Sequence, residues 1–441
     1  MRTEWWRVTA PLALVGCVAT GCGRSTLQPA LPGPGLFPSG THVGVYGSNR
    51  RYLQHANGEP FVLIGFGNEG RNSPAVIAQL AGKINYQRAY AASWNQSRSA
   101  NEYALGRPWP DVNGQSDMSV WNETYWNNLR DYLVHTRDAG ITVGLTLWDG
   151  HSDLPGGASG SQSTWNAALN LQGIQWAYDV TALNQYPNPR ANGGAAERLV
   201  FYQRRWIDRL LVEIERYPNV VIELDNETDQ APVAWWLWWA DYIRSKQPLV
   251  IATTWNASAT IPDDVFSSDP RLDMKSYHDR SDVSLTPERY GWNKVIVADA
   301  DNSCSDLDAD TARGVAWQSV LRGGQWNDFV CLDTSGFPDL AKVGYYGILL
   351  DFLQTRNVRP WIMAPHDELV NGARCMALPG AFYLVYTSTS VTVDLTSMSG
   401  TGTWEWFDPR TGTTTQSGQV AGGAPRTFSL PSAGDYVLWI R

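Results

Sequence analysis

The sequence is poor in charged residues, cysteine and histidine, and each scarcity excludes a class of function. Only 17% of the 441 residues are charged, and the formal net charge is -9. A weakly charged, acidic chain is unsuited to nucleic acid or an anionic membrane surface as its main partner, so a neutral ligand fits better. The six histidines and five cysteines form no HExxH, clustered-histidine or paired-cysteine motif. We therefore expect no metal and no cofactor.

Long hydrophobic runs are also missing. The apolar run at residues 8–15 is shorter than the roughly 20 residues that cross a bilayer. With arginines before it, the run reads as an export signal over residues 1–22, followed by a Pro/Gly-rich tether over residues 23–42. It resembles a bacterial lipoprotein signal in which Cys17 or Cys22 is lipidated, and ordinary secretory cleavage is the alternative. We expect a location in the bacterial cell envelope or outside the cell, with membrane contact only through that lipid.

Aromatic residues are abundant instead. The chain holds 22 Trp, 19 Tyr and 11 Phe, a set dominated by the two rings that combine an apolar face with a polar edge. Sugars present the same mixture. Most such rings fill a core, and this applies above all to Trp235-Trp236-Leu237-Trp238-Trp239, which lies in a segment with a helical pattern.

Short apolar runs alternate with helical patterns over residues 43–365. Asn57-Gly58, between two strand-like segments, predicts a hairpin at the start of this region. Helical spacing recurs around Trp126 and around Trp206, in each case just before a strand-like run. Eight runs are short and mostly apolar, as in parallel strands buried on both faces: 61–67, 86–91, 141–148, 220–224, 249–255, 274–277, 295–298 and 329–332. The pattern predicts an α/β fold, a (β/α)8 TIM barrel, with its active site at the C-terminal ends of the strands.

The pattern changes after Pro365 to short alternating strands separated by Gly and Thr. A small all-β sandwich domain is expected over residues 366–441. Its candidate strands are 382–387, 391–395, 403–407, 413–416, 426–430 and 436–440.

Export would permit disulfides, and three cysteines remain beyond the signal: Cys304, Cys331 and Cys375. Their number is odd, so at least one stays free if Cys22 is lipidated or removed. We expect Cys304 to pair with Cys331, because both lie in or beside neighbouring strands at one side of the barrel.

Carboxylates at two strand ends carry the chemistry. Glu227 follows the fourth run and should point into the barrel mouth, with Asn226 beside it to bind a sugar hydroxyl. Glycoside hydrolysis needs a second carboxylate across the scissile bond. Asp299 follows the seventh run directly, and Asp301 lies two residues later on the same side of an extended chain. Either can be the nucleophile, and Asp299 is preferred.

Further candidates lie around the same mouth. Arg88 is a cation inside the second strand, where an unpaired charge would be costly, so it should pair with a catalytic carboxylate and lower the pKa of the nucleophile. A purely structural ion pair is the alternative. The candidate substrate-binding residues at or near strand ends are Trp94, Trp148, Asp149, Trp255, Tyr277, His278 and Trp326.

With these residues placed, the chain resembles a bacterial family of apiosidase-like barrels related to the clan A glycoside hydrolases. The resemblance runs from about residue 50 to the end. It is carried by Arg51-Tyr52-Leu53, Asn57-Gly58-Glu59-Pro60-Phe61, Tyr217-Pro218-Asn219, Asn226-Glu227, Asp299-Ala300-Asp301-Asn302 and Trp317-Gln318-Ser319-Val320-Leu321-Arg322-Gly323. The segment Trp404-Glu405-Trp406-Phe407-Asp408-Pro409 resembles part of a small β-domain that such proteins carry under a collagen-binding label. Support of the barrel explains such a domain equally well.

The resemblance implies an acid/base role for Glu227. The family nucleophile on strand seven is usually Glu, whereas this chain has Asp299, one methylene shorter. Retention is expected, and the wider gap between the carboxylates leaves inversion open. The expected function is an exported glycoside hydrolase acting on a polysaccharide or oligosaccharide. The alternative is a non-catalytic cell-surface barrel that binds a glycan or a matrix protein. The pattern assigns no sugar, linkage or oligomeric state.

Overall fold

The computed structural model describes residues 42–67, 71–91, 102–103, 107–150, 163–228, 231–255, 261–278, 285–300, 307–329 and 339–441. Only the backbone is described at 71–72, 102–103, 255 and 329. Several residues named above lie outside the described residues: Cys17, Cys22, Trp94, Asp301, Cys304 and Cys331. For Trp255, the side chain is likewise outside the description.

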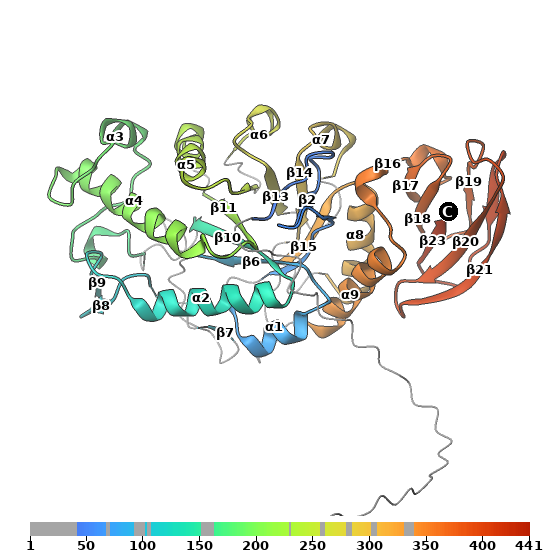
Figure 1. Ribbon diagram of the computed structural model, residues 1–441, viewed down its shortest axis with the longest axis horizontal. Helices are drawn as coiled ribbons and strands as arrows, with labels where there is room; N and C mark the ends of the chain where they lie inside the picture. The colour runs from blue at the N-terminus through green and yellow to red at the C-terminus, as the bar shows by residue number, and fades with distance from the viewer. Residues whose placement is uncertain are drawn as a thin grey trace, which may run out of the picture.

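Eight parallel strands close into a barrel, which confirms the predicted fold (Figure 1). In chain order they are β4 (Ile64–Gly67), β6 (Tyr86–Tyr90), β10 (Thr142–Asp149), β11 (Val220–Asn226), β12 (Ile251–Trp255), β13 (Met274–His278), β14 (Val295–Asp299) and β15 (Gln325–Phe329). β15 pairs with β4 to complete the ring. The carboxyl ends of all eight strands therefore meet at one end of the barrel.

The eighth strand differs from its predicted position. It spans Gln325–Phe329, whereas the apolar pattern placed it at 329–332. The pattern failed because this strand buries polar side chains that have partners inside the protein. Gln325 Oε1 accepts from the backbone N–H of Leu63, and Asp328 accepts from the hydroxyl of Tyr346. A buried polar residue is tolerated when it is hydrogen-bonded, so the strand need not be apolar.

Helices surround the barrel (Figure 1). They are α1 (Pro74–Leu80), α2 (Glu123–Asp138), α3 (Val180–Gln185), α4 (Ala195–Ile214), α5 (Val233–Lys246), α6 (Asp263–Ser268), α7 (Pro287–Gly291), α8 (Ala309–Leu321) and α9 (Leu340–Thr355). α2 and α4 contain Trp126 and Trp206, as the helical spacing predicts. The tryptophan-rich segment forms α5, and Trp235, Trp236 and Trp239 are buried in the core, which confirms that reading.

A three-stranded antiparallel sheet closes the other end of the barrel. It consists of β1 (Gly44–Val45), β2 (Leu53–Gln54) and β3 (Pro60–Phe61). β2 and β3 form the hairpin predicted from Asn57-Gly58, and Gly58 has a φ of 91° that favours glycine. Side chains of this sheet pack against residues at the start of the barrel strands in one inner cluster. In the described part of the chain that end is a packed core, which closes it to a ligand.

Smaller pairs of strands lie outside the barrel. They are β5 (Arg71–Asn72) with β7 (Glu102–Tyr103), and β8 (Asp111–Val112) with β9 (Gln115–Ser116). Among the described residues, no helix combines the length and apolar character that a membrane span requires.

The C-terminal region forms two packed antiparallel sheets, as expected. The larger contains β16 (Ala364–Pro365), β17 (Arg374–Leu378), β18 (Phe382–Thr387), β23 (Tyr436–Ile440), β20 (Thr401–Asp408) and β21 (Thr413–Ala421). The smaller pairs β19 (Val391–Val393) with β22 (Arg426–Phe428). The sequence pattern did not indicate β16 or β17. Cys375 on β17 is a free, buried thiol, and burial raises its pKa.

The larger sheet packs on the barrel helices α8 and α9, beside which it lies in Figure 1. Trp317 of α8 stacks on Tyr386 of β18, with ring centroids 6.5 Å apart. Arg313 of α8 binds Asp435 with an N–O distance of 2.8 Å. Alternate residues of the strands face this contact and the inner core of the sandwich, so the domain supports the barrel through a continuous apolar interface.

Candidate active site

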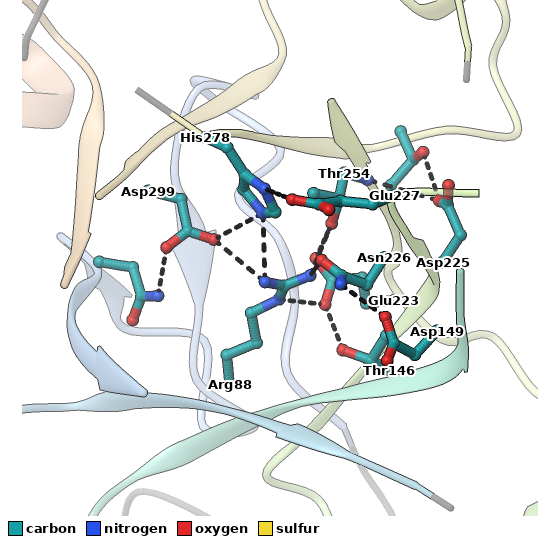
Figure 2. A network of polar contacts seen from close by, with 12 residues as sticks. Arg88, Thr146, Asp149, Glu223, Asp225, Asn226, Glu227, Thr254, His278 and Asp299 are labelled. Carbon is teal, nitrogen blue, oxygen red and sulfur yellow. Dashed lines mark hydrogen bonds and ion pairs between the residues drawn. The ribbon is translucent and has the colours of Figure 1, made fainter. Parts of the chain in front are cut away.

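The end of β11 departs from regular strand alternation, and this departure builds the site. In a regular strand, Glu223 and Asn226 would point to opposite faces. Instead, both side chains contact Arg88 inside the barrel, while Asp225 between them bonds to Thr253 and Thr228. The deviation brings two polar groups of one strand to the same cation (Figure 2).

Arg88 on β6 is the centre of the network. Its side chain is fully buried, and Nε donates to Glu223 Oε2 at 2.6 Å. One Nη donates to Asn226 Oδ1 at 2.8 Å, and the other lies 3.6 Å from Asp299 Oδ2. Nearby carboxylates outweigh the effect of burial and raise the pKa of Arg88. Arg88 is therefore a permanent cation, and its closest ion pair is with Glu223.

Glu223 lies below the mouth and acts as a fixed counter-ion. Its side chain is fully buried, and it accepts hydrogen bonds from the hydroxyls of Thr146 and Thr254 as well as from Arg88. A carboxylate with all these donors is held in place and has little capacity for a substrate. The structural ion pair considered for Arg88 thus exists beside its contact with Asp299.

Glu227 follows β11 in a left-handed backbone conformation with a φ of 50°. A non-glycine residue in this region is uncommon and such residues cluster at functional sites. The backbone there is also crowded, because a Cβ on Gly150 would lie 2.1 Å from the Glu227 carbonyl oxygen. Glycine at position 150 therefore lets the end of β10 approach Glu227. The Glu227 side chain remains 13% exposed, so it can meet a ligand.

His278 at the end of β13 lies between the two candidate catalytic carboxylates (Figure 2). Arg88 Nη1 is 3.2 Å from His278 Nε2, and a guanidinium can only donate. Nε2 must therefore accept, which assigns the ring proton to Nδ1. Nδ1 then donates to Glu227 Oε1 over 2.8 Å. His278 therefore orients Glu227 through its Oε1.

Asp299 ends β14 and is fully buried. Its Oδ1 accepts from Asn327 Nδ2 at 2.7 Å. Its Oδ2 has no hydrogen-bond donor among the described residues, although Arg88 Nη1 and His278 Nε2 lie at 3.6 and 3.8 Å. Burial raises the pKa of Asp299 to about 6, while Arg88, His278 and Asn327 act in the opposite direction. The expectation that Arg88 produces a net lowering is thus wrong, because desolvation is the larger effect.

Asn226 and Asp149 connect the site to β10. Asn226 Nδ2 donates to Asp149 Oδ1 at 2.7 Å, while its carbonyl oxygen accepts from Arg88. The amide orientation of Asn226 is therefore fixed by a donor on one side and an acceptor on the other. Both side chains are almost completely buried, so they hold the neighbouring polar groups in place and offer little surface to a ligand.

Three expected sugar-binding rings are buried outside the barrel interior. Trp148 packs against Trp235 of α5 with centroids 4.9 Å apart, and Trp326 packs against Tyr346. Tyr277 donates its hydroxyl to Asp263 on α6 at 2.6 Å. None of the three exposes more than 1% of its surface, so their assignment as substrate-binding residues is wrong. The inward side chain at each place belongs to the next residue, namely Asp149, Asn327 and His278.

Sequence reasoning missed Thr146, Thr254 and Asn327. The sequence signal that could have found them is a polar residue inside a short, buried strand. Such a residue needs a buried hydrogen-bond partner. Asn327 also depends on Gly65 of β4, where a Cβ would lie 2.2 Å from Asn327 Oδ1. In the part of the chain that the structure describes, no group of three or more His, Cys, Asp or Glu side chains is placed to hold a metal.

Comparison with solved structures places this architecture among glycoside hydrolases. A protein titled glycoside hydrolase aligns with a TM-score of 0.62 and 14% identity, over 91% of this chain and 96% of its own. A glycoside hydrolase family 5 protein from Bacteroides vulgatus aligns with a TM-score of 0.60 and 15% identity, over 90% and 93% of the two chains. The chain shares the fold of these proteins. At such identities the likeness establishes the fold and leaves the activity to the site.

Three further comparisons concern another solved structure, the C-terminal region and the curated proteins. A second Bacteroides vulgatus protein, described in its title as a possible glycoside hydrolase, aligns with a TM-score of 0.64 and 13% identity, over 91% of this chain and 82% of its own. Residues 364–441 match the family described as "Putative collagen-binding domain of a collagenase". No curated protein sequence matches this chain.

Proposed function

We propose that the protein is a glycoside hydrolase with Glu227 as acid/base and Asp299 as nucleophile. The observation that carries the proposal is the arrangement of His278 between these two carboxylates at the C-terminal end of the barrel. The other end is closed by the N-terminal sheet, so a sugar would approach both groups from the C-terminal end. The fold of the similar glycoside hydrolases supports the same reading.

The reaction assigns one role to each of the two carboxylates. The carboxyl group of Glu227 gives its proton to the glycosidic oxygen as the bond to the anomeric carbon breaks, and the leaving sugar departs as an alcohol. Asp299 Oδ2 forms a bond to the same carbon. Water then attacks that carbon, Glu227 takes a proton from the water, and the bond to Asp299 breaks. Two displacements retain the anomeric configuration.

The deciding experiment for this assignment is a screen of the purified full chain against a polysaccharide panel, which includes apiose-containing glycans because of the family resemblance. Released sugars are identified by mass, and NMR of the first product gives its anomeric configuration. We expect a released sugar with retained configuration. An inverted product would remove Asp299 from the nucleophile role.

The two aspartates are separated by substitution. We expect Asp299→Asn to lower kcat by at least about a hundredfold, because an amide cannot act as the nucleophile. Asp301→Asn should retain activity within a few-fold. The measurement is kcat on the best substrate of the panel, with circular dichroism to check the fold. An inactive Asp301→Asn beside an active Asp299→Asn would reverse the assignment.

The pH dependence of activity should report the ionisation of Asp299. Since only the carboxylate can attack, we expect kcat/KM to fall as the pH drops below about 6. Asp225 provides a matched control, because burial also raises its pKa to about 6, but its carboxylate faces Thr253 and Thr228. Asp225→Asn should leave the fall of kcat/KM at acidic pH unchanged. If this decrease of kcat/KM disappears in Asp225→Asn, the assignment to Asp299 is contradicted.

The same shift affects stability with a defined sign. The pKa of Asp299 is higher in the folded protein than its ordinary value of 3.8. Protonation therefore favours the folded state, and this contribution is lost as the pH rises through about 6.

Complete burial of Asp299 favours one second candidate, a barrel that binds a glycan without cleaving it. The match of residues 364–441 adds a matrix protein as a possible ligand of such a barrel. A glycan array run beside the product assay separates the candidates, since tight binding without a released sugar supports the binding role.

We also propose export with a lipid at Cys17 or Cys22, based on the sequence of residues 1–22. The test is incorporation of labelled palmitate in a bacterial host. Loss of the label in Cys17→Ser or in Cys22→Ser identifies the modified residue, and absence of label from the unaltered chain contradicts the proposal.

A further inference from the structure

A cavity of about 260 Å³ lies at the junction of the barrel and the C-terminal domain, away from Glu227 and Asp299. One wall comes from the segment that follows α9, including the 3-10 helix η4 (Pro360–Ile362), and the other from β18 and β23. The lining residues are Arg356, Asn357, Arg359, Ile362, Met363, Phe382, Trp439 and Arg441. The volume lies below the range of drug-sized ligand pockets and suits one sugar ring.

The floor of the cavity is apolar and aromatic. Phe382 lies parallel to Trp439, with ring centroids 5.6 Å apart and an interplanar angle of 10°. Trp439 is buried beneath it, whereas Phe382 is only partly covered. Ile362, beside them, is 43% exposed. The C–H face of a sugar ring can lie on such a surface, because it is the apolar side of an otherwise polar molecule.

The remaining lining is cationic. None of the eight lining residues is acidic, and three are arginines. Arg356 Nε donates to Glu405 at 3.0 Å, and Arg441 Nη1 lies 3.6 Å from the same oxygen. Two guanidinium groups thus share one carboxylate. The cavity keeps a positive potential that would attract an anion.

Arg359 is the guanidinium that this network leaves without a counter-charge. It makes no ion pair with any described residue, and its Nε donates to the neutral Asn357 Oδ1 at 3.1 Å. Asn357 has a φ of 50°, a conformation that asparagine tolerates better than most residues. An arginine oriented through Nε retains both Nη groups for a carboxylate, the planar partner that a guanidinium binds best.

We propose that this cavity binds a uronic acid residue of an acidic glycan. The carboxylate pairs with Arg359, and the sugar ring lies against Phe382. Among the residues that the structure describes, the barrel site has the opposite character, with Asp149, Glu223, Glu227 and Asp299 around the cation Arg88. An acidic sugar is therefore bound at the domain junction and disfavoured in the barrel mouth. The proposal does not depend on hydrolase activity.

The test measures binding of oligogalacturonate to the full chain by calorimetry. The methyl-esterified oligosaccharide is the matched ligand, since it keeps the ring and removes the charge. We expect Arg359→Gln to raise the Kd roughly tenfold to a hundredfold and Phe382→Ala roughly threefold to tenfold. Arg426→Gln is the control, because Arg426 lies in the same domain outside the cavity lining and should leave the Kd unchanged.

The Glu227→Gln variant distinguishes binding in this cavity from binding in the barrel mouth. Oligogalacturonate binding that persists in Glu227→Gln and weakens in Arg359→Gln supports the proposal, whatever the outcome of the hydrolase assay. Equal binding of the methyl ester overturns it, and so does a Kd that neither Arg359→Gln nor Phe382→Ala changes. Absence of oligogalacturonate binding by the unaltered chain also overturns it.

Discussion

Glu227→Gln is expected to lower kcat on an unactivated glycoside by about a hundredfold to ten-thousandfold, the usual range for loss of a general acid. The amide has nearly the shape of the acid, and its oxygen can still accept the proton that His278 Nδ1 donates at 2.8 Å. The fold and the position of His278 should therefore persist. What disappears is the proton that the leaving oxygen needs.

The leaving group provides an internal check on this role. In an aryl glycoside with an acidic phenol, the phenol can leave as the phenolate without a proton from Glu227. Glu227→Gln should therefore slow cleavage of this glycosidic bond far less than cleavage of the bond in a natural glycoside. The measurement compares kcat/KM, which reports the steps up to the first bond cleavage, for the two substrate types in the same variant. Glu288→Gln, an exposed glutamate on α7, is the control. Equal rates for Glu227→Gln and the unaltered chain would remove Glu227 from the mechanism.

Arg88→Leu is expected to lower the free energy of unfolding by about 3–5 kcal/mol, the usual cost of removing one partner from a buried ion pair. Glu223 binds Arg88 at 2.6 Å and both side chains are fully buried. Removal of the guanidinium leaves Glu223 with only the hydroxyls of Thr146 and Thr254 among its described donors, and it removes the cation beside Asp299. Urea unfolding followed by tryptophan fluorescence measures the change.

Two comparisons show whether burial causes this effect. Arg137→Leu removes a surface pair with Asp138 at a similar distance, 2.7 Å, and should cost less than about 1 kcal/mol. The double variant Arg88→Leu/Glu223→Leu removes both charges, so its loss should be smaller than the sum of the two single losses. Additive losses would contradict the coupling between Arg88 and Glu223.

The barrel was predictable because its strands follow a simple pattern. Runs such as 220–224 and 295–298 are short, mostly apolar and separated by helical segments. A parallel sheet covered on both faces suits that alternation. The position of β15 was not predicted, because Gln325, Asn327 and Asp328 are polar. Their partners are Leu63 just before β4, Asp299 of β14 and Tyr346 of α9, which lie 262, 28 and 18 residues away along the chain.

The site was predictable in its composition and only partly in its geometry. Glu227, Asn226, Asp299, Arg88 and His278 are brought together as expected, since each lies in or at the end of a barrel strand. The orientation of neighbouring rings was not predictable from position alone. Trp148, Tyr277 and Trp326 also lie in barrel strands, yet their side chains belong to the outer core.

The sequence by itself determined the barrel, the C-terminal sandwich and the strand ends that carry carboxylates, because periodicity and strand order are local properties of the chain. Tertiary structure alone decided which groups act together. It paired Arg88 with Glu223, set the proton on His278 Nδ1 toward Glu227, and buried Asp299 far enough to raise its pKa to about 6. These properties depend on distances between strands and on exclusion of water, and both arise only when the barrel closes.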